Sequence, residues 1–386
     1  MISHVSTAVP VMGETMGRTL RDLHGPWLDM LLLGGASVIA YVLIVLLDPT
    51  TTQTVVLGGV MMVLANFVNH PHFAHSYQIF YGSWRDVRSC EMPSSLRARW
   101  YLAGVVLPAT LAVWLAVAGW RWMEGDTWLM GVSLNLMGAL VGWHYVKQGF
   151  GMAMMDAALK KKFWTPAARQ ALLWNAYACW LAAWVLINSS RGGQAYWGIF
   201  GIGLTVPPVI VIAACLVVVL TTLWAALAAL RSLGRWPLRQ HRWHELPISG
   251  LAAYFVTLYL WTVFSWVNPA YMLVIPFFHS VQYLAVVWRY KQNEILAHNN
   301  LAGKSMARFW AIGFLLGALG FWLVPVAIDF AHSGYLPNVS NPGQPALAIG
   351  AFWIFINVHH YLIDNVLWRQ GNPKVNQYLF NAGLKG

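Results

Sequence analysis

The sequence has very little charge for its length. Only 10% of its 386 residues are Asp, Glu, Lys or Arg, whereas a soluble domain of ordinary composition has about a quarter. Hydrophobic residues make up 58%, and the mean hydropathy is +0.54. The scarcity of charge excludes a soluble enzyme, a disordered chain and a nucleic-acid-binding module, and it indicates an integral membrane protein.

Cysteine is also scarce. Cys90, Cys179 and Cys215 stand far apart and form no CxxC pair, so we expect neither a disulfide framework nor a thiolate metal site. The first 26 residues are polar and lack the apolar core and cleavage site of a secretory signal. We expect residues 1–26 to form a cytoplasmic segment and the first apolar span to act as the insertion signal.

Long apolar runs follow one another through the rest of the chain. With about 20 residues for one crossing, the sequence predicts an all-α transmembrane bundle of about ten spans that forms a single domain, 1–386. The predicted spans are 28–47, 54–81, 100–119, 128–157, 169–188, 198–230, 248–267, 270–290, 308–330 and 346–368. The segments between them are short, so any chemistry must take place inside the bundle or at its mouth.

The positive charges are unevenly distributed between the spans. On one side, the connecting segments hold only Arg121 and Arg191, and every other Lys or Arg except Lys147 lies on the opposite side. By the positive-inside rule, both ends of the chain, including the tail 370–386, are predicted to be cytoplasmic. The expected location is the inner (cytoplasmic) membrane of the cell.

Histidine is unusually frequent, with 13 residues against 13 Asp and Glu together. Seven lie within four spans that all run from outside to inside: His70, His72, His75, His144, His279, His359 and His360. Ionisable groups inside a membrane are costly and indicate function, and neutral imidazole is the commonest metal ligand. The pattern predicts a metal site, while each single histidine is also explained by a helix–helix hydrogen bond.

Three of these spans share a spacing. His75, His279 and His359 each stand ten residues before an arginine that follows a tryptophan. Ten residues of helix rise about 15 Å, roughly half the hydrocarbon thickness. We therefore expect the three rings to lie at nearly the same depth, close to the middle of the membrane.

Proline interrupts the first group of histidines. Pro71 lies between His70 and His72, and it has no backbone N–H to donate to the preceding helical turn. This favours a kink or opened turn that directs both histidine rings inward. The sequence leaves open which of these two histidines is a ligand.

Other polar residues accompany the histidines. Asp364 stands one turn after His360, and a carboxylate at that depth needs a metal, a cation or a proton; a salt bridge to Lys147 is the alternative. The predicted catalytic residues are Asp364, Tyr283, Tyr361 and Lys147. The predicted outer partners, which would hold the histidine tautomers, are Asn66, Asn69, Gln78, Gln148, Gln282 and Asn357. Packing between helices also explains the tyrosines and amides.

Seven nitrogen donors and one carboxylate are more than one zinc ion needs, and a set of nitrogen and oxygen ligands suits iron. With these residues the chain resembles the histidine-rich integral membrane di-iron enzymes: fatty-acid desaturases, sterol and carotenoid hydroxylases and alkane monooxygenases. That class uses HxxxH and HxxHH boxes, whereas this chain has HPHFAH at 70–75 and an isolated HH at 359–360.

The resemblance implies two iron ions and an O2-dependent oxidoreductase of the oxygenase, hydroxylase or desaturase type. Its expected partners are the lipid bilayer, a hydrophobic small-molecule substrate and a cytoplasmic electron-donor protein, with no nucleic acid. A second likeness, to the bacterial membrane β-carotene-cleaving dioxygenases, bears only on the type of substrate.

Three other functions are compatible with the same residues. A b-type haem or quinone electron-transfer protein would use His75 with His279, or His144 with His360, as axial pairs. A zinc-dependent lipid hydrolase would use Asp364 or Ser76 to activate water. A proton or metal transporter would use the histidines and the carboxylate as a relay.

Overall fold

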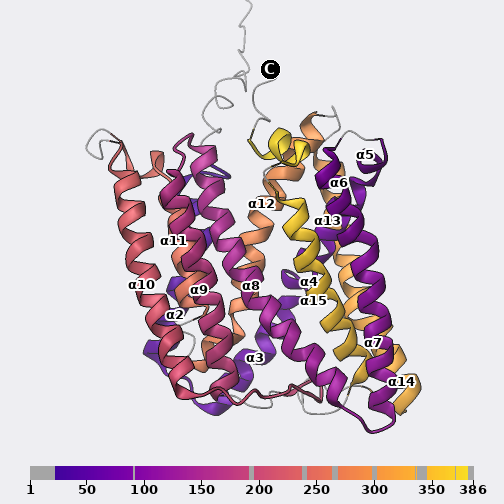
Figure 1. The fold of residues 1–386 in the computed structure, drawn as a ribbon. Helices are drawn as coiled ribbons and strands as arrows, with labels where there is room; N and C mark the ends of the chain where they lie inside the picture. Colours follow the sequence, from indigo (N-terminus) through magenta and orange to yellow (C-terminus); the bar gives the residue numbers. More distant parts are fainter. Residues whose placement is uncertain are drawn as a thin grey trace, which may run out of the picture.

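The computed structural model describes residues 22–89, 92–190, 195–236, 241–262, 268–297, 302–334, 336, 346–369 and 371–380. The predicted N-terminal segment is therefore described only from Asp22 onwards, and the predicted tail only at 371–380. Cys90 and Arg191 lie outside the described residues. The described chain is almost entirely helical (Figure 1), which confirms the all-α fold class.

Nine helices of the described residues are long and apolar enough to cross a membrane. They are Pro26–Leu47, Thr51–Arg88, Ser94–Met123, Trp128–Leu159, Pro166–Ser189, Pro208–Leu233, Ala270–Ala297, Ser305–Ser333 and Leu347–Leu367. The long helices stand side by side as one bundle (Figure 1). The chain is therefore a polytopic helical bundle, as the apolar runs predict.

Uninterrupted α-helices form four of these spans: α8 (Trp128–Leu159), α9 (Pro166–Ser190), α10 (Pro208–Leu233) and α15 (Leu347–Leu367). The span Ala270–Ala297 begins in a short 3-10 helix, and α12 (Ile275–Ala297) forms the rest of it. Three other spans contain a π-helical turn: α1 (Pro26–Met30), η2 (Leu31–Gly35) and α2 (Ala36–Leu47); α6 (Ser94–Tyr101), η3 (Leu102–Val106) and α7 (Leu107–Met123); α13 (Ala302–Ala318), η8 (Leu319–Leu323) and α14 (Val324–Ser333). Short helices at the ends of the bundle are α5 (Trp84–Arg88), η4 (Trp243–Glu245), α16 (Pro373–Val375) and η9 (Asn376–Phe380).

The second predicted span is a broken helix. α3 (Thr51–Ala65) ends at a turn over 66–68, and α4 (Asn69–Gly82) begins immediately after it. The turn lies just before Pro71, which has no backbone N–H to continue the hydrogen-bond ladder across the break. An opened turn is thus present where the sequence predicts it, and the group of three histidines lies in the first two turns of α4.

The predicted span 248–267 is shorter in the structure. The described helix consists of α11 (Ile248–Phe255) and η5 (Val256–Leu260), and it is too short to be one of the nine spans. The chain resumes at a short helix, η7 (Pro269–Leu273), where the Asn268 side chain accepts a hydrogen bond from the backbone N–H of Ala270. Residues 263–267 lie outside the described part.

The predicted span 198–230 begins too early. Residues 195–200 form a small hairpin of β1 (Ala195–Tyr196) and β2 (Ile199–Phe200), in which Ala195 pairs with Phe200 and Tyr196 with Ile199. The two turn residues, Trp197 and Gly198, have positive φ angles of 54° and 75°, the conformation that tight hairpin turns require. The apolar run continues into the helix only at Pro208, because the hairpin uses its first residues.

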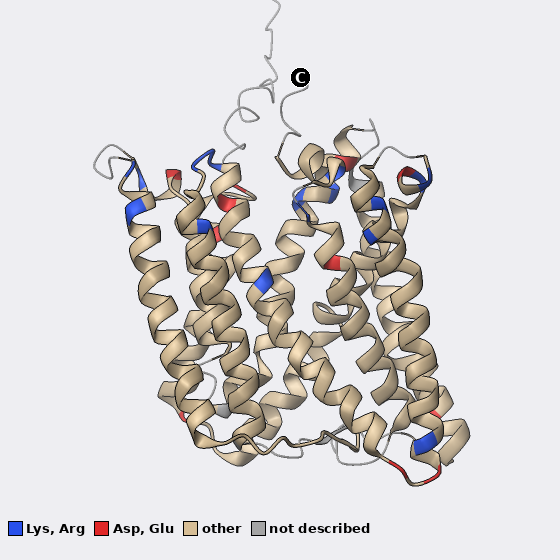
Figure 2. Cartoon of the chain, in the orientation of Figure 1, with Lys and Arg blue, Asp and Glu red and all other residues tan. Residues whose placement is uncertain are grey.

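Lys and Arg collect mainly at one end of the bundle (Figure 2). That end carries the short helices α5 and α16, and the opposite end carries the exposed pair of Arg121 and Asp126, whose side chains lie 2.8 Å apart. We call the lysine- and arginine-rich end the cytoplasmic end, following the orientation predicted from the sequence.

Candidate metal centre

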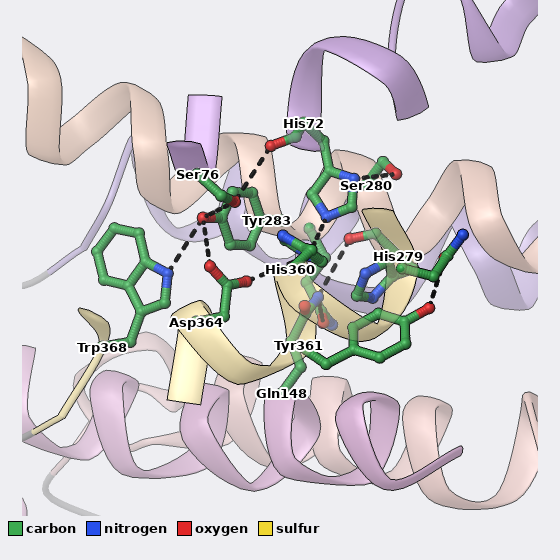
Figure 3. Close-up of polar contacts among 12 residues, drawn as sticks. His72, Ser76, Gln148, His279, Ser280, Tyr283, His360, Tyr361, Asp364 and Trp368 are labelled. Carbon is green, nitrogen blue, oxygen red and sulfur yellow. Dashed lines mark hydrogen bonds and ion pairs between the residues drawn. The ribbon is translucent and has the colours of Figure 1, made fainter. Parts of the chain in front are cut away.

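Four buried histidines from four different helices meet inside the bundle. They are His72 of α4, His144 of α8, His279 of α12 and His360 of α15. Each offers one ring nitrogen, and these four atoms all lie within 4.8 Å of one another. None of the four residues is more than 5% exposed. We call this group the four-histidine cluster; Figure 3 labels three of its members.

The spacing of the rings matches what a single metal ion requires. The Nε2 atoms of His72 and His360 are 2.9 Å apart, and the His144 ring lies 5.0 Å from the His279 and His360 rings, centroid to centroid. With metal–nitrogen bonds of about 2.1 Å, two donors on one ion lie about 3 to 4 Å apart. Small side-chain rotations would therefore bring all four nitrogens onto one ion.

Several ring nitrogens in the cluster have no hydrogen-bond partner among the described residues. These are both nitrogens of His279, Nε2 of His144 and Nδ1 of His360. An unpaired polar atom in a protein interior is costly and uncommon. Buried histidines with unpaired ring nitrogens are expected where the missing partner is a metal ion.

Hydrogen bonds orient the His72 ring. Its Nδ1 lies 3.1 Å from the backbone carbonyl oxygen of Asn69 and 3.3 Å from the Ser280 hydroxyl, which in turn donates to the Asn69 side chain. A proton on Nδ1 leaves the Nε2 lone pair free to face the cluster. The role of Ser280 could not be found from the sequence, because a serine beside a histidine carries no distinctive signal.

An aromatic ring holds His144 in place. The Tyr361 ring stacks on it at 4.4 Å between centroids and 25° between planes. The Tyr361 hydroxyl donates to the Asn357 side chain at 2.6 Å. These two predicted residues therefore lie beside the cluster, and they act on the orientation of a histidine.

Two glutamines tie the helices together at His279. The Gln148 amide donates to the His279 backbone carbonyl (3.1 Å) and to the Gln282 side-chain oxygen (2.7 Å). Gln282 in turn donates to the backbone carbonyl of Leu33 in η2. The two amides thus connect α8, α12 and η2 beside the cluster.

A carboxylate network borders the cluster on one side (Figure 3). One oxygen of Asp364 lies 3.3 Å from Nε2 of His360, and the other accepts a hydrogen bond from the Tyr283 hydroxyl at 3.0 Å. The Tyr283 oxygen also contacts the Ser76 hydroxyl (2.5 Å) and accepts from the Trp368 indole N–H (3.2 Å). Two of the predicted catalytic residues, Asp364 and Tyr283, are therefore in contact with each other.

Lys147 does not join the cluster, contrary to its predicted catalytic role. Its ammonium group lies 5.5 Å from the Phe150 ring centre and 5.7 Å from that of Tyr177 in α9. It faces α9, so the alternative salt bridge to Asp364 is not formed either. Residues three apart on a helix differ by about 60° in direction, enough to separate Lys147 from His144.

His70 and His75 face away from the cluster. The His70 ring stacks on Phe321 at 4.1 Å between centroids. The His75 ring stacks on Phe309 at 4.3 Å, and its Nδ1 lies 3.1 Å from the Gln78 amide nitrogen. Residues two apart on a helix point about 160° apart. The Pro71 break therefore cannot direct both His70 and His72 inward, as we expected from the sequence.

His359 is also separate from the cluster. Its Nδ1 lies 2.6 Å from the Tyr77 hydroxyl and its Nε2 lies 2.9 Å from the backbone carbonyl oxygen of Ala103. Both ring nitrogens are used in hydrogen bonds between helices. The three histidines that share the spacing thus lie on helices that contribute to the cluster, but only His279 belongs to it. The other two helices contribute His72 and His360 instead.

Two predicted outer partners lie elsewhere. Asn66 accepts a hydrogen bond from the Trp322 indole at 2.6 Å, and Gln78 contacts His75. A cavity of about 410 Å³ near the cytoplasmic end is lined by Gln78, Lys291, Arg308 and other residues of α12 and α13. None of the four cluster histidines lines it.

Comparison of the chain with protein-family models, with curated proteins and with solved structures finds no match. The interpretation of the site therefore rests on its own geometry.

Proposed function

We propose that this chain is a membrane-embedded, iron-dependent oxidoreductase that uses O2 to oxidise a lipid-soluble substrate. The observation that carries the proposal is the four-histidine cluster, buried among apolar helices and bordered by Asp364 and Tyr283. Whatever the reaction, four buried histidines that could hold a metal ion lie inside a helical, membrane-type protein.

One ion suits the cluster better than two. Four nitrogens within 4.8 Å of one another surround a single point, and His70, His75 and His359 have other neighbours. Catalytic zinc takes three protein ligands and a water molecule, so four histidines would leave a tetrahedral zinc closed. An ion that accepts six ligands would keep two open positions, and imidazole nitrogens suit iron. We therefore propose one iron ion in place of the expected pair.

The cluster disfavours a haem. A bis-histidine haem needs a free plane between its two axial ligands. Here the remaining two histidines would occupy that plane, because all four donors converge. The axial pair of His75 with His279 is also unsupported, since His75 stacks on Phe309.

When bound, the iron ion would supply O2 activation. The residues of the chain have three tasks around it. The four histidines hold the ion without adding negative charge. The apolar helices around the cluster exclude bulk water. The hydrogen bond from the Tyr283 hydroxyl to Asp364 keeps a transferable proton next to His360. The substrate and a cytoplasmic electron donor remain those expected from the sequence.

Metal content tests the proposal directly. Purified protein is expected to contain one iron per chain, without the Soret band of haem. His72→Ala and His360→Ala should lose most of the iron. The matched controls are His75→Ala and His359→Ala, which remove equally buried histidines of the same helices and should retain it.

Elemental analysis and optical spectra of the folded, monodisperse fraction provide the measurement. Zinc as the sole metal would refute the oxidoreductase proposal, and so would a Soret band. Equal iron in the cluster variants and in the controls would refute the ligand assignment.

A further inference from the structure

We propose that a row of four aromatic side chains carries single electrons between the cytoplasmic end and the four-histidine cluster. The row consists of Tyr283, Trp368, Tyr290 and Tyr378, and we call it the aromatic row. This inference rests on the proposed redox function, and it adds the route by which electrons from a cytoplasmic reductant reach the buried cluster.

The rings form an unbroken series of contacts. Tyr283 lies 4.8 Å from the His72 ring, centroid to centroid, and 5.9 Å from Trp368. Trp368 lies 5.7 Å from Tyr290, and Tyr290 lies 5.5 Å from Tyr378. All four distances fall in the range of packed aromatic pairs, about 4.5 to 7 Å. Electron transfer between rings in such contact needs only short steps.

The row spans the distance from the cluster to the cytoplasmic end. Tyr283 and Tyr290 are seven residues apart on α12, two helical turns on one face. Tyr378 belongs to η9 beyond the end of α15, and its backbone carbonyl accepts a hydrogen bond from the Asn293 side chain at 2.7 Å. The three tyrosines are only 1–4% exposed. Every member is Tyr or Trp, the two side chains that one-electron oxidation reaches most easily.

Tyr283 also has a place for its proton. A tyrosine that loses an electron gives up its phenolic proton, and the Tyr283 hydroxyl already donates to Asp364 at 3.0 Å. The Trp368 indole N–H donates to the same phenolic oxygen at 3.2 Å, which couples the first two members of the row.

The transfer balances in electrons and protons. With an oxidised metal ion bound in the cluster, Tyr283 would supply one electron, and its phenolic proton would move along the hydrogen bond to Asp364. Trp368 then gives one electron to the Tyr283 radical, which takes its proton back. Tyr290 reduces the Trp368 radical and Tyr378 then reduces the Tyr290 radical; each tyrosine gives its phenolic proton to a neighbouring acceptor as it loses an electron and takes the proton back when it is reduced. A one-electron reductant, an iron–sulfur or flavin protein, finally reduces the Tyr378 radical. The net result is one electron delivered to the metal centre, with the row unchanged.

A light-triggered experiment tests the row without depending on catalysis. A ruthenium photo-oxidant is attached to Gln377→Cys, an exposed position beside Tyr378, in full-length protein carrying Cys90→Ser, Cys179→Ala and Cys215→Ser. After a flash, the photo-oxidant takes one electron from Tyr378. Transient absorption and electron paramagnetic resonance should then show the Tyr378 radical decaying as a second tyrosyl radical forms at Tyr283. In Tyr283→Phe this second radical should be absent, while the first radical, at Tyr378, should still form.

Substitutions within the row give the decisive comparison. Trp368→Phe should slow formation of the Tyr283 radical by at least an order of magnitude, and Trp368→Tyr should restore it, because tyrosine is also oxidisable. The matched control is Trp288→Phe, which removes an exposed tryptophan of α12 and should leave the rate unchanged.

Two results would overturn the inference: an unchanged radical yield and rate in folded Trp368→Phe, or no radical at Tyr283 in the parent protein. Because the photo-oxidant supplies the driving force, the outcome is independent of iron content. A chain without iron can therefore refute the proposed function and still conduct electrons, and the reverse result is equally detectable.

Discussion

At the scale of single residues, neighbouring histidines do different work. His360 contributes to the cluster, while the adjacent His359 forms hydrogen bonds with the Tyr77 hydroxyl and with the backbone carbonyl of Ala103 in η3. Successive residues on a helix point about 100° apart, so a vicinal pair cannot direct both rings at one point. In this helix, α15, the vicinal pair therefore places one ring, that of His360, in the cluster.

Glycines determine how closely helices approach the histidines that lie outside the cluster. A Cβ atom at Gly313 of α13 would overlap the His75 imidazole ring. Gly313→Ala should therefore force α13 away from α4 and cost about 1 to 3 kcal/mol of stability, the usual cost of overpacking. The measurement is the midpoint of thermal unfolding in detergent.

The matched control is Gly151→Ala in α8, where an added Cβ would meet nothing within 4 Å. It should leave the protein equally or slightly more stable, since alanine is a better helix former. Equal midpoints for the two variants would contradict the predicted contact between α13 and His75.

At the scale of elements, α8 and α11 are joined by a buried charged group near the cytoplasmic end. Asp156 accepts a hydrogen bond from the backbone N–H of Gly250 (2.7 Å) and lies 2.7 Å from the Lys160 ammonium group. A Cβ at Gly250 would lie 2.5 Å from the Met152 carbonyl oxygen, so the two helices are in close contact. The α8 helix that is held in this way carries both His144 and Gln148.

Asp156→Ala should destabilise the protein by about 3 kcal/mol, because the buried Lys160 ammonium group loses its closer carboxylate and keeps only Asp22, 3.8 Å away. Loss of the anchor should also lower iron binding, since α8 holds one ligand. Thermal unfolding and metal analysis measure the two effects.

Asp126→Ala serves as the control. It removes the partner of Arg121 in an ion pair whose side chains are 39–45% exposed, and exposed pairs contribute little. A control that loses as much stability as Asp156→Ala would show that burial does not govern these ion pairs.

At the scale of the whole molecule, charge marks the two ends of the bundle. Lys and Arg collect at the end that carries α5 and α16 (Figure 2), and the positive-inside rule predicts that this end is cytoplasmic. The aromatic row ends on the same side, which is where a soluble reductant would be.

Single cysteines test this orientation in a cysteine-free background. Glu124→Cys, in the exposed turn after α7, should react with a membrane-impermeant thiol reagent in intact cells, because that turn is expected outside. Ser89→Cys, exposed after α5, should react only after the membrane is permeabilised. The opposite pattern would reverse the topology and would place Tyr378 away from any cytoplasmic donor.

Composition and spacing were sufficient for the class of fold and for the four helices that carry the centre. Low charge and long apolar runs require a helical bundle, and the cost of intramembrane histidines selects α4, α8, α12 and α15. Two predicted boundaries were wrong for local reasons. A tight turn at Trp197 and Gly198 makes a hairpin of the first residues of one apolar run, and another run forms the short helix of α11 and η5.

Spacing along a helix determines the angle between two residues, but it does not determine how that helix is rotated against its neighbours. Packing decides that rotation: the His75 ring fits against Gly313, and His70 packs against Gly317. With α4 held in this way, only His72 can face α12 and α15. The sequence by itself thus determined the membrane bundle and its seven histidines. Only the tertiary structure decided that four of them converge in one cluster, because convergence depends on helix rotations that no single segment encodes.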